Sequence, residues 1–154
     1  MARLDSLSGI ERKVLETLAC PTFDTQPWVD GPPLNQRRVA IISTGGLHRQ
    51  DDRPFTFDAG DYYRIIPGDV KAADLLMSHL STNFDHSGFQ QDWNVVFPID
   101  RLQELAQEGV IGSVADFHYS FMGATDPMQM EQDARKLAAI LKQDKVDALL
   151  LLPV

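Results

Sequence analysis

The spacing of apolar residues predicts three amphipathic helices along the chain. Residues 4–19 place apolar side chains at every third or fourth position, and Pro21 ends this pattern. A second helix is predicted from Asp100, where an apolar stripe begins, to a C-cap at Gly109. A third is predicted over residues 126–145, which begin with an Asp-Pro pair suited to a first helical turn.

Strands are predicted between and after these helices. Residues 38–43 and 146–152 are continuous apolar runs, which are typical of parallel strands buried on both faces. Residues 110–114 are interpreted as a further strand or a strand-like turn. Residues 117–121 alternate in a way that predicts a half-buried strand, and a short strand fits residues 62–66 inside a loop-like region.

Strands that alternate with helices of these lengths predict right-handed parallel units. We therefore predict an α/β fold with three layers and a mostly parallel, Rossmann-like sheet. The long polar loops at residues 47–69 and 80–94 are expected over its active edge, because ligands in such folds bind beyond the carboxyl ends of the strands. Residues 1–36 are predicted to form an N-terminal helix and a Pro-rich arm, and residues 37–154 the α/β domain, in a single globular unit.

Composition narrows the class of protein. Of the 154 residues 44% are hydrophobic and 23% charged, as in soluble globular proteins. The net charge of −8 argues against nucleic-acid binding. The longest apolar run, residues 148–154, is too short to cross a membrane, and the charged N-terminal residues do not fit a signal peptide, so we expect a cytoplasmic protein. Cys20, the single cysteine, is interpreted as a packing residue.

The first candidate site follows the strand at residues 38–43. There the hydroxyls and backbone N–H groups of a Ser-Thr-Gly-Gly sequence could cradle a carboxylate or phosphate. The alternative is a tight turn in which the glycines supply a positive φ. The candidate substrate-binding residues are Ser43, Thr44, Gly45 and Gly46.

Histidines beside polar loops form the second candidate site. An imidazole next to a carboxylate is well suited to proton transfer. The acid–base candidates are His48, His79, His86 and His118, with Asp85 and Asp92 as orienting partners. No known ligand spacing is present, so we predict no metal, and His118 has the alternative role of a structural hydrogen-bonding residue.

Asp100 has two interpretations. With Gln103 three residues later it fits a capping box at the start of the second helix, and this is the favoured reading. With Arg101 it would form a charge pair or an anion clamp instead.

Taken in order, several short motifs resemble the selenoprotein B family of glycine, sarcosine, betaine and D-proline reductases. The resemblance covers about residues 37–154. Its motifs are Ala40-Ile-Ile-Ser-Thr-Gly-Gly-Leu-His48, Pro54-Phe55, Gly60-Asp61, Arg64-Ile-Ile-Pro67, Asp69-Val70, Ser78-His79, Asp85-His86, Asp92-Trp-Asn94, Phe97-Pro-Ile-Asp-Arg101, Glu108-Gly-Val-Ile-Gly112 and His118-Tyr-Ser-Phe-Met-Gly123.

The resemblance implies an oxidoreductase that cleaves a C–N bond of a small amino acid or betaine with electrons from a dithiol or thioredoxin-like donor. A pyruvoyl group on a companion subunit activates the amine, and a selenolate attacks the activated carbon. The selenocysteine, or a cysteine followed two residues later by another, is expected just after Val154. A selenolate is ionised at neutral pH, so it is a stronger nucleophile than a thiol.

The chain stops at Val154, before that redox residue. We hypothesise that a UGA codon was read as a stop, so that the 154-residue chain is inactive; a naturally short protein is the competing explanation. The alternative function is a non-catalytic module that binds a small anion or a metal. Because the apolar strand at residues 146–152 lacks a following helix, we also expect the chain to form a homo-oligomer.

Overall fold

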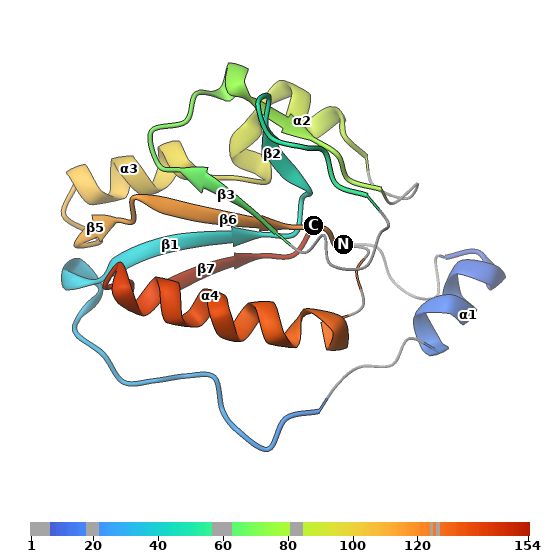
Figure 1. Ribbon diagram of the computed structural model, residues 1–154, viewed down its shortest axis with the longest axis horizontal. Coiled ribbons are helices and arrows are strands. Elements are labelled where there is room, and N and C mark those ends of the chain that lie inside the picture. Colours follow the sequence, from blue (N-terminus) through green and yellow to red (C-terminus); the bar gives the residue numbers. More distant parts are fainter. Residues whose placement is uncertain (1–6, 18–21, 57–62, 81–84, 124, 126) are drawn as a thin grey trace.

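A computed structural model describes residues 7–17, 22–56, 63–80, 85–123, 125 and 127–154 (Figure 1). Its main sheet is built on β1, which pairs in parallel with three other strands, while one further strand runs antiparallel at the edge beside β6. The strands are β1 (Arg38–Ser43), β3 (Tyr63–Pro67), β5 (Ser113–Val114), β6 (Phe117–Phe121) and β7 (Ala148–Leu152). The predicted α/β fold with a mostly parallel sheet is confirmed.

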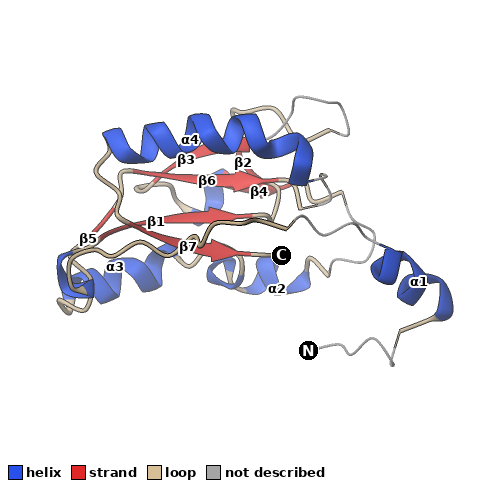
Figure 2. Cartoon of the chain, turned by 90° about the horizontal axis from the view of Figure 1, so that it is seen from below, coloured by secondary structure: helices blue, strands red, loops and turns tan. Residues whose placement is uncertain are grey.

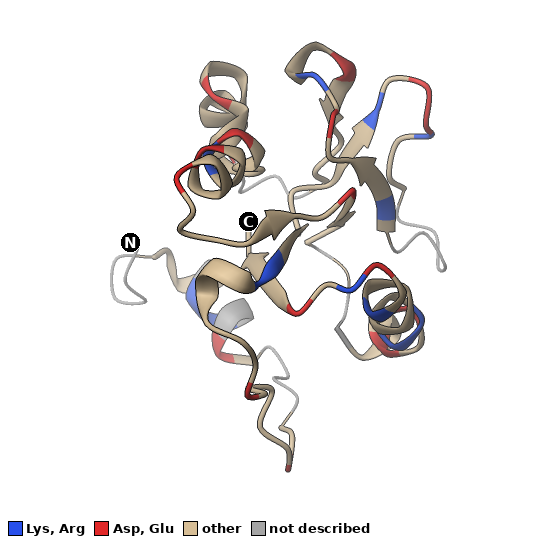
Figure 3. Ribbon diagram, turned by 90° about the vertical axis from the view of Figure 1, so that its left-hand side faces the viewer, with Lys and Arg blue, Asp and Glu red and all other residues tan. Residues whose placement is uncertain are grey.

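Helices cover both faces of this sheet, which gives the three layers (Figure 1). Figure 2 looks onto the sheet from the α4 side. On one face, α3 (Ile99–Gln107) packs over a cluster that includes Ile41 and Phe97. On the other face, α4 (Glu131–Gln143) buries Leu137 and Leu141 against Ala40, Tyr119 and Phe121. Charged positions lie mainly on the helices and loops that surround the sheet (Figure 3).

The remaining elements are short. A separate two-stranded antiparallel ribbon, β2 with β4, lies on the α3 side of the sheet (Figure 1). The bounds of these elements are α1 Gly9–Thr17, η2 Leu34–Gln36, β2 Leu47–Arg49, η3 Ala72–Asp74, β4 Leu75–Met77, α2 Ser87–Gln91, η4 Trp93–Val95 and η5 Pro127–Met130. No helix among the described residues is long and apolar enough to cross a membrane.

Several predicted boundaries were too generous. The first helix is α1, Gly9–Thr17, although part of the predicted range and Cys20 lie outside the described residues. The strand predicted at residues 110–114 is only β5, because Val110 N–H donates to the Leu105 carbonyl and so continues the cap of α3. Gly109, at φ 73°, supplies the left-handed turn of that cap, as predicted.

The capping role predicted for Asp100 is wrong. Helix α3 begins one residue earlier, at Ile99, and the Asn94 Oδ1 accepts the Asp100 N–H at 3.2 Å. The Asp100 carboxylate turns back instead and accepts hydrogen bonds from Trp93 Nε1 and Asn94 Nδ2, both at 2.8 Å. Gln103 donates to the Gly68 carbonyl, so the capping box is absent as well.

β7 is buried on one face only. It pairs with β1 along one edge, and its Leu150 packs into the core, whereas Leu149 and Leu151 are 45% and 64% exposed. An apolar run in the sequence fits either a strand buried on both faces or an edge strand. Here β7 is an edge strand, and α4 does not cover its second face.

Candidate functional site

The turn after β1 does not present a free anion cradle. Thr44 N–H donates to the Leu152 carbonyl, Gly45 N–H to Ser43 Oγ, and Gly46 N–H to the Phe121 carbonyl. Ser43 is fully buried. Gly46 has a φ of 65°, so the alternative reading of a tight glycine turn is the one the structure supports. These bonds occupy the backbone N–H groups that were predicted to bind substrate: those of Thr44 and Gly46 tie the end of β1 to β7 and β6, and that of Gly45 folds back onto Ser43.

The same turn holds the segment that follows β7. The Val154 N–H donates to Thr44 Oγ1 at 2.8 Å, and Gly123 N–H donates to the Thr44 carbonyl at 2.9 Å. A Cβ placed on Gly123 would lie 3.0 Å from three atoms: His79 Nε2, the Thr44 oxygen and the Val154 oxygen. The carboxyl ends of β1, β6 and β7 therefore converge on one point beside the His79 ring.

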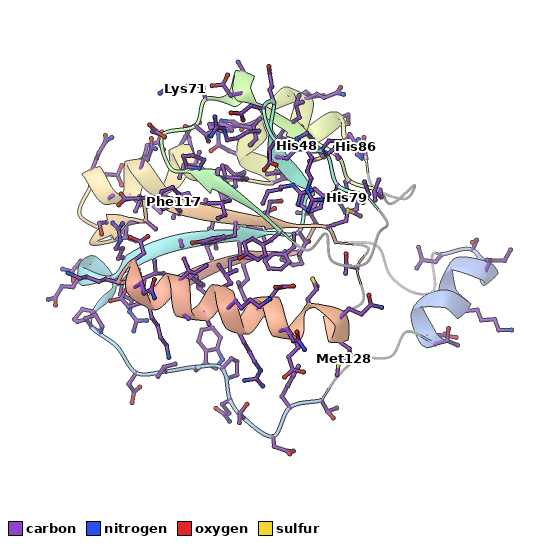
Figure 4. All side chains as sticks on the ribbon, in the orientation of Figure 1. His48, Lys71, His79, His86, Phe117 and Met128 are labelled. Carbon is purple, nitrogen blue, oxygen red and sulfur yellow. The ribbon has the colours of Figure 1, made fainter. Side chains whose placement is uncertain are left out.

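His79 and His86 form a pair at this edge of the sheet (Figure 4). Their ring centroids are 6.4 Å apart, in an edge-on arrangement. Burial and the neighbouring His86 lower the pKa of His79, against the opposing effect of a hydrogen bond to the Val154 backbone. The His79 ring is therefore neutral at pH 7 and can accept a proton.

His48 belongs to the β2–β4 ribbon. Its ring is buried, and the carbonyl of Arg49 accepts a hydrogen bond from Nδ1 at 2.9 Å, which places the proton on that nitrogen. In this tautomer Nε2 accepts from the Ser78 hydroxyl at 2.8 Å. Both ring nitrogens thus serve to fix the segment that leads into His79, and His48 is a supporting residue rather than a free base.

Asp85 and Asp92 hold turns instead of orienting imidazoles. Asp85 Oδ1 accepts the Ser87 N–H at 2.9 Å, and this bond holds the pKa of Asp85 below its ordinary value. Asp92 Oδ1 accepts from Nδ2 and N–H of Asn94, which lowers the pKa of Asp92 in the same way. These bonds explain both carboxylates locally, in place of the predicted orienting role.

His118 lies inside the core, away from the other three histidines. Val39 pairs with Val114, and Ile42 pairs with Tyr119. Residues 115–118 therefore lie opposite residues 40–41 of β1, so the segment that joins β5 to β6 has two extra residues. The His118 ring fills this bulge, and its Nδ1 accepts the Ile41 N–H at 2.9 Å. The predicted place at the active edge is wrong, whereas the alternative structural role fits.

The described residues contain no group of three or more His, Cys, Asp or Glu side chains arranged to hold a metal ion. Both ring nitrogens of His48 and the Nδ1 of His118 are already committed to bonds within the protein. The pair of His79 and His86 is what remains at the edge.

Comparison with known proteins decides the family. The family model described as glycine/sarcosine/betaine reductase selenoprotein B matches residues 14–153. The chain belongs to this family. The matched region includes the β7 segment and every histidine considered above, so the family resemblance read from the motifs is confirmed.

Curated relatives of this selenoprotein B chain are reductase subunits. D-proline reductase subunit gamma of Acetoanaerobium sticklandii is 31% identical over 154 residues, which cover 98% of the chain and 61% of the relative. Glycine reductase complex component B subunit gamma of Symbiobacterium thermophilum is 31% identical over 140 residues, covering 85% of the chain and 32% of the relative. Sarcosine reductase complex component B subunit beta of Peptoclostridium acidaminophilum is 33% identical over 110 residues, 67% of the chain and 24% of the relative.

The chain spans less than two thirds of the length of these relatives. No solved structure matches it.

The roles of two site residues, Thr44 and Gly123, were not predicted from the sequence. Thr44 was predicted to bind substrate, but its hydroxyl binds the backbone of Val154. Gly123 ends one of the family motifs, yet it is the point at which three strands and His79 meet. The signal available in the sequence was the Met-Gly pair directly after a predicted strand, where a glycine permits close backbone approach.

Proposed function

We propose that this chain forms the substrate-side part of a reductase that cleaves the C–N bond of a small amino acid or betaine-like amine. Its relatives are named for D-proline, glycine, betaine and sarcosine reductases, and most are named as components of larger complexes. The proposal includes a selenocysteine or cysteine directly after Val154, a pyruvoyl group on a companion subunit, and a dithiol or thioredoxin-like donor.

The observation that carries the proposal is the position of Val154. Its backbone is held by Thr44 and lies against the neutral ring of His79, with His86 alongside. A residue that follows Val154 emerges at this histidine pair, and it does so at the carboxyl edge where α/β folds place their chemistry.

These residues suit the proposed redox residue. A neutral imidazole can take the proton from a selenol or thiol and so maintain the anionic nucleophile. The selenolate or thiolate attacks the activated carbon, so that a Se–C or S–C bond forms as the C–N bond breaks and the amine leaves with a proton. The thiolate two residues later then attacks the selenium or sulfur and releases the carbon, which takes up a proton. The dithiol donor reduces the resulting selenenylsulfide or disulfide. His79 is proposed as the acid–base residue; burial first, and the neighbouring His86 second, keep its pKa low.

The coding sequence after Val154 gives the first test. An in-frame UGA, followed two codons later by a cysteine codon, supports the proposed redox centre, and an unrelated continuation contradicts it. The form that carries this residue is then assembled with its companion subunit and assayed with D-proline, glycine, sarcosine and betaine in the presence of dithiothreitol. We expect turnover of one of the four amines.

The 154-residue chain serves as the negative control in that assay. Cys20 is its only cysteine, so we expect no turnover from this chain. Turnover that disappears on the substitution Cys20→Ala would contradict the proposed place of the redox residue.

A further inference from the structure

The segment after β7 leaves the regular pairing of the sheet at Pro153. Within β7 each residue from Ala148 to Leu152 pairs with β1, and the Leu152 carbonyl still accepts the Thr44 N–H at 3.0 Å. Proline has no backbone N–H, so Pro153 cannot extend the ladder. Ordinary strand pairing therefore does nothing to fix the chain beyond this point.

The Thr44 side chain takes over at the next residue. Its Oγ1 accepts the Val154 N–H at 2.8 Å, a strong hydrogen bond by distance. The contacts from Oγ1 to the Leu152 and Val154 carbonyls are 3.5 and 3.4 Å, too long to add much. One bond, from Val154 to the threonine hydroxyl, thus restores the attachment that Pro153 interrupts.

Gly123 completes the arrangement from the side of β6. Its N–H binds the Thr44 carbonyl, and the absence of a side chain lets that oxygen, the Val154 oxygen and His79 Nε2 approach the same point. A methyl group there would lie 3.0 Å from all three, closer than normal carbon contacts, so they would have to move apart.

We propose that Thr44 and Gly123 are positioning residues that fix the residue after Val154 against the His79 ring. The chemistry of that residue rests on the proposed function, but its placement does not. Neither residue contacts the reacting amine in this proposal: Thr44 acts through the backbone of Val154, and Gly123 through the room it leaves for His79.

A single cysteine added directly after Val154, in a Cys20→Ser background, reports this placement without any reductase assay. The rate of alkylation by iodoacetamide is measured from pH 5 to 10. Transfer of the thiol proton to His79 pairs the thiolate with an imidazolium, and this pair should move the midpoint below that of a free cysteine. A midpoint about one pH unit lower raises the thiolate fraction at pH 7 roughly eightfold, and the lower nucleophilicity of that thiolate leaves a rate gain of about threefold.

Four substitutions separate positioning from general stability. Thr44→Val keeps the shape of the side chain and removes the hydroxyl, so the midpoint should return to that of a free cysteine, as it should in His79→Gln. Thr44→Ser keeps the hydroxyl and should keep the low midpoint. Gly123→Ala, which leaves the hydroxyl in place, should raise the midpoint by displacing Val154 from His79. Circular dichroism is recorded for each variant.

An unchanged midpoint in folded Thr44→Val would overturn the proposal, as would a midpoint in Thr44→Ser that equals the one in Thr44→Val. If Thr44→Val fails to fold, Gly123→Ala and Thr44→Ser decide the outcome in the same assay. A low midpoint that depends on Thr44, together with a longer form that turns over none of the four amines, would leave the positioning intact and reject the proposed function.

Discussion

His118 shows how a titratable residue can serve the fold alone. Its ring is fully buried against Phe97, at 5.6 Å between centroids, and it accepts the Ile41 N–H inside the β5–β6 bulge. Burial lowers the pKa of His118 to about 4, so the ring stays neutral in the folded protein through most of the acidic range. Only the neutral form has the free Nδ1 that accepts this hydrogen bond.

This low pKa predicts a loss of stability in acid. An unfolded histidine titrates near 6.5, so between pH 6.5 and 4 the unfolded state binds the proton and the folded state does not. The contribution of His118 to the free energy of unfolding is complete above pH 6.5. It should fall by about 3 kcal/mol as the pH drops to 4. Urea unfolding at a series of pH values measures this loss.

His118→Asn is the matched variant, because its Oδ1 can take the place of Nδ1 as acceptor for Ile41. It should unfold with a shallower pH dependence, with a smaller slope remaining from His79, whose pKa is also lowered. His118→Leu should lose about 1–3 kcal/mol at pH 8, since the Ile41 N–H is left buried without a partner. A His118→Asn protein with the full pH dependence of the parent would contradict this assignment.

Among the elements, β1, α4 and the β5–β6 bulge are joined by Arg38. The guanidinium donates to the Asp144 carbonyl, the Asp144 carboxylate and the Val114 carbonyl at 2.8–2.9 Å, and it lies 3.1 Å from Asp116. Its planar array of donors matches all of these acceptors at once, which a lysine cannot do.

Arg38→Met should therefore lower the free energy of unfolding by about 3 kcal/mol, because Asp144 loses its partner in a half-buried place. Arg38→Lys should recover less than half of this loss. Arg135→Met is the matched control: its pair with Glu131 is exposed on α4, so its removal should cost less than about 1 kcal/mol. Equal losses for Arg38 and Arg135 in urea unfolding would contradict the role of Arg38.

The elements that depend on local rules were predictable from the sequence. The apolar run of β1 and the glycine cap at Gly109 are determined by neighbouring residues, and both lie where predicted. The role of Asp100 depends on Trp93 and Asn94 folding back onto it. The edge position of β7 and the plugging of the bulge by His118 depend on pairing between distant segments. The residue types alone identified His79 and His86 as acid–base candidates, but they could not exclude His48 or His118 from that role.

On the scale of the whole molecule, the outer edge of β7 stands out. Among the described residues β7 pairs only with β1, and Leu149, Leu151 and Ile140 of α4 leave apolar surface exposed. An apolar strand with an unpaired edge favours association with another chain. The expected homo-oligomer stays a prediction, and this edge is its proposed contact.

Sedimentation velocity at tens of micromolar tests that prediction. A dimer or larger species should appear, and Leu151→Lys should shift it toward monomer by placing a charge on the exposed face of β7. Ile65→Lys is the control, since Ile65 is similarly exposed on β3, the opposite edge strand, and should leave the association unchanged. A monomeric parent chain would contradict the prediction.

The central claim is that chemistry takes place at the carboxyl end of β7, beside His79. The most direct measurement is the kcat of the assembled reductase that carries the redox residue after Val154, compared between His79→Gln and His118→Asn. Loss of a general acid–base residue should lower kcat about 100-fold or more in His79→Gln, whereas His118→Asn should stay within about twofold of the parent. A His79→Gln enzyme with parental kcat, or an equal loss in His118→Asn, would contradict the account.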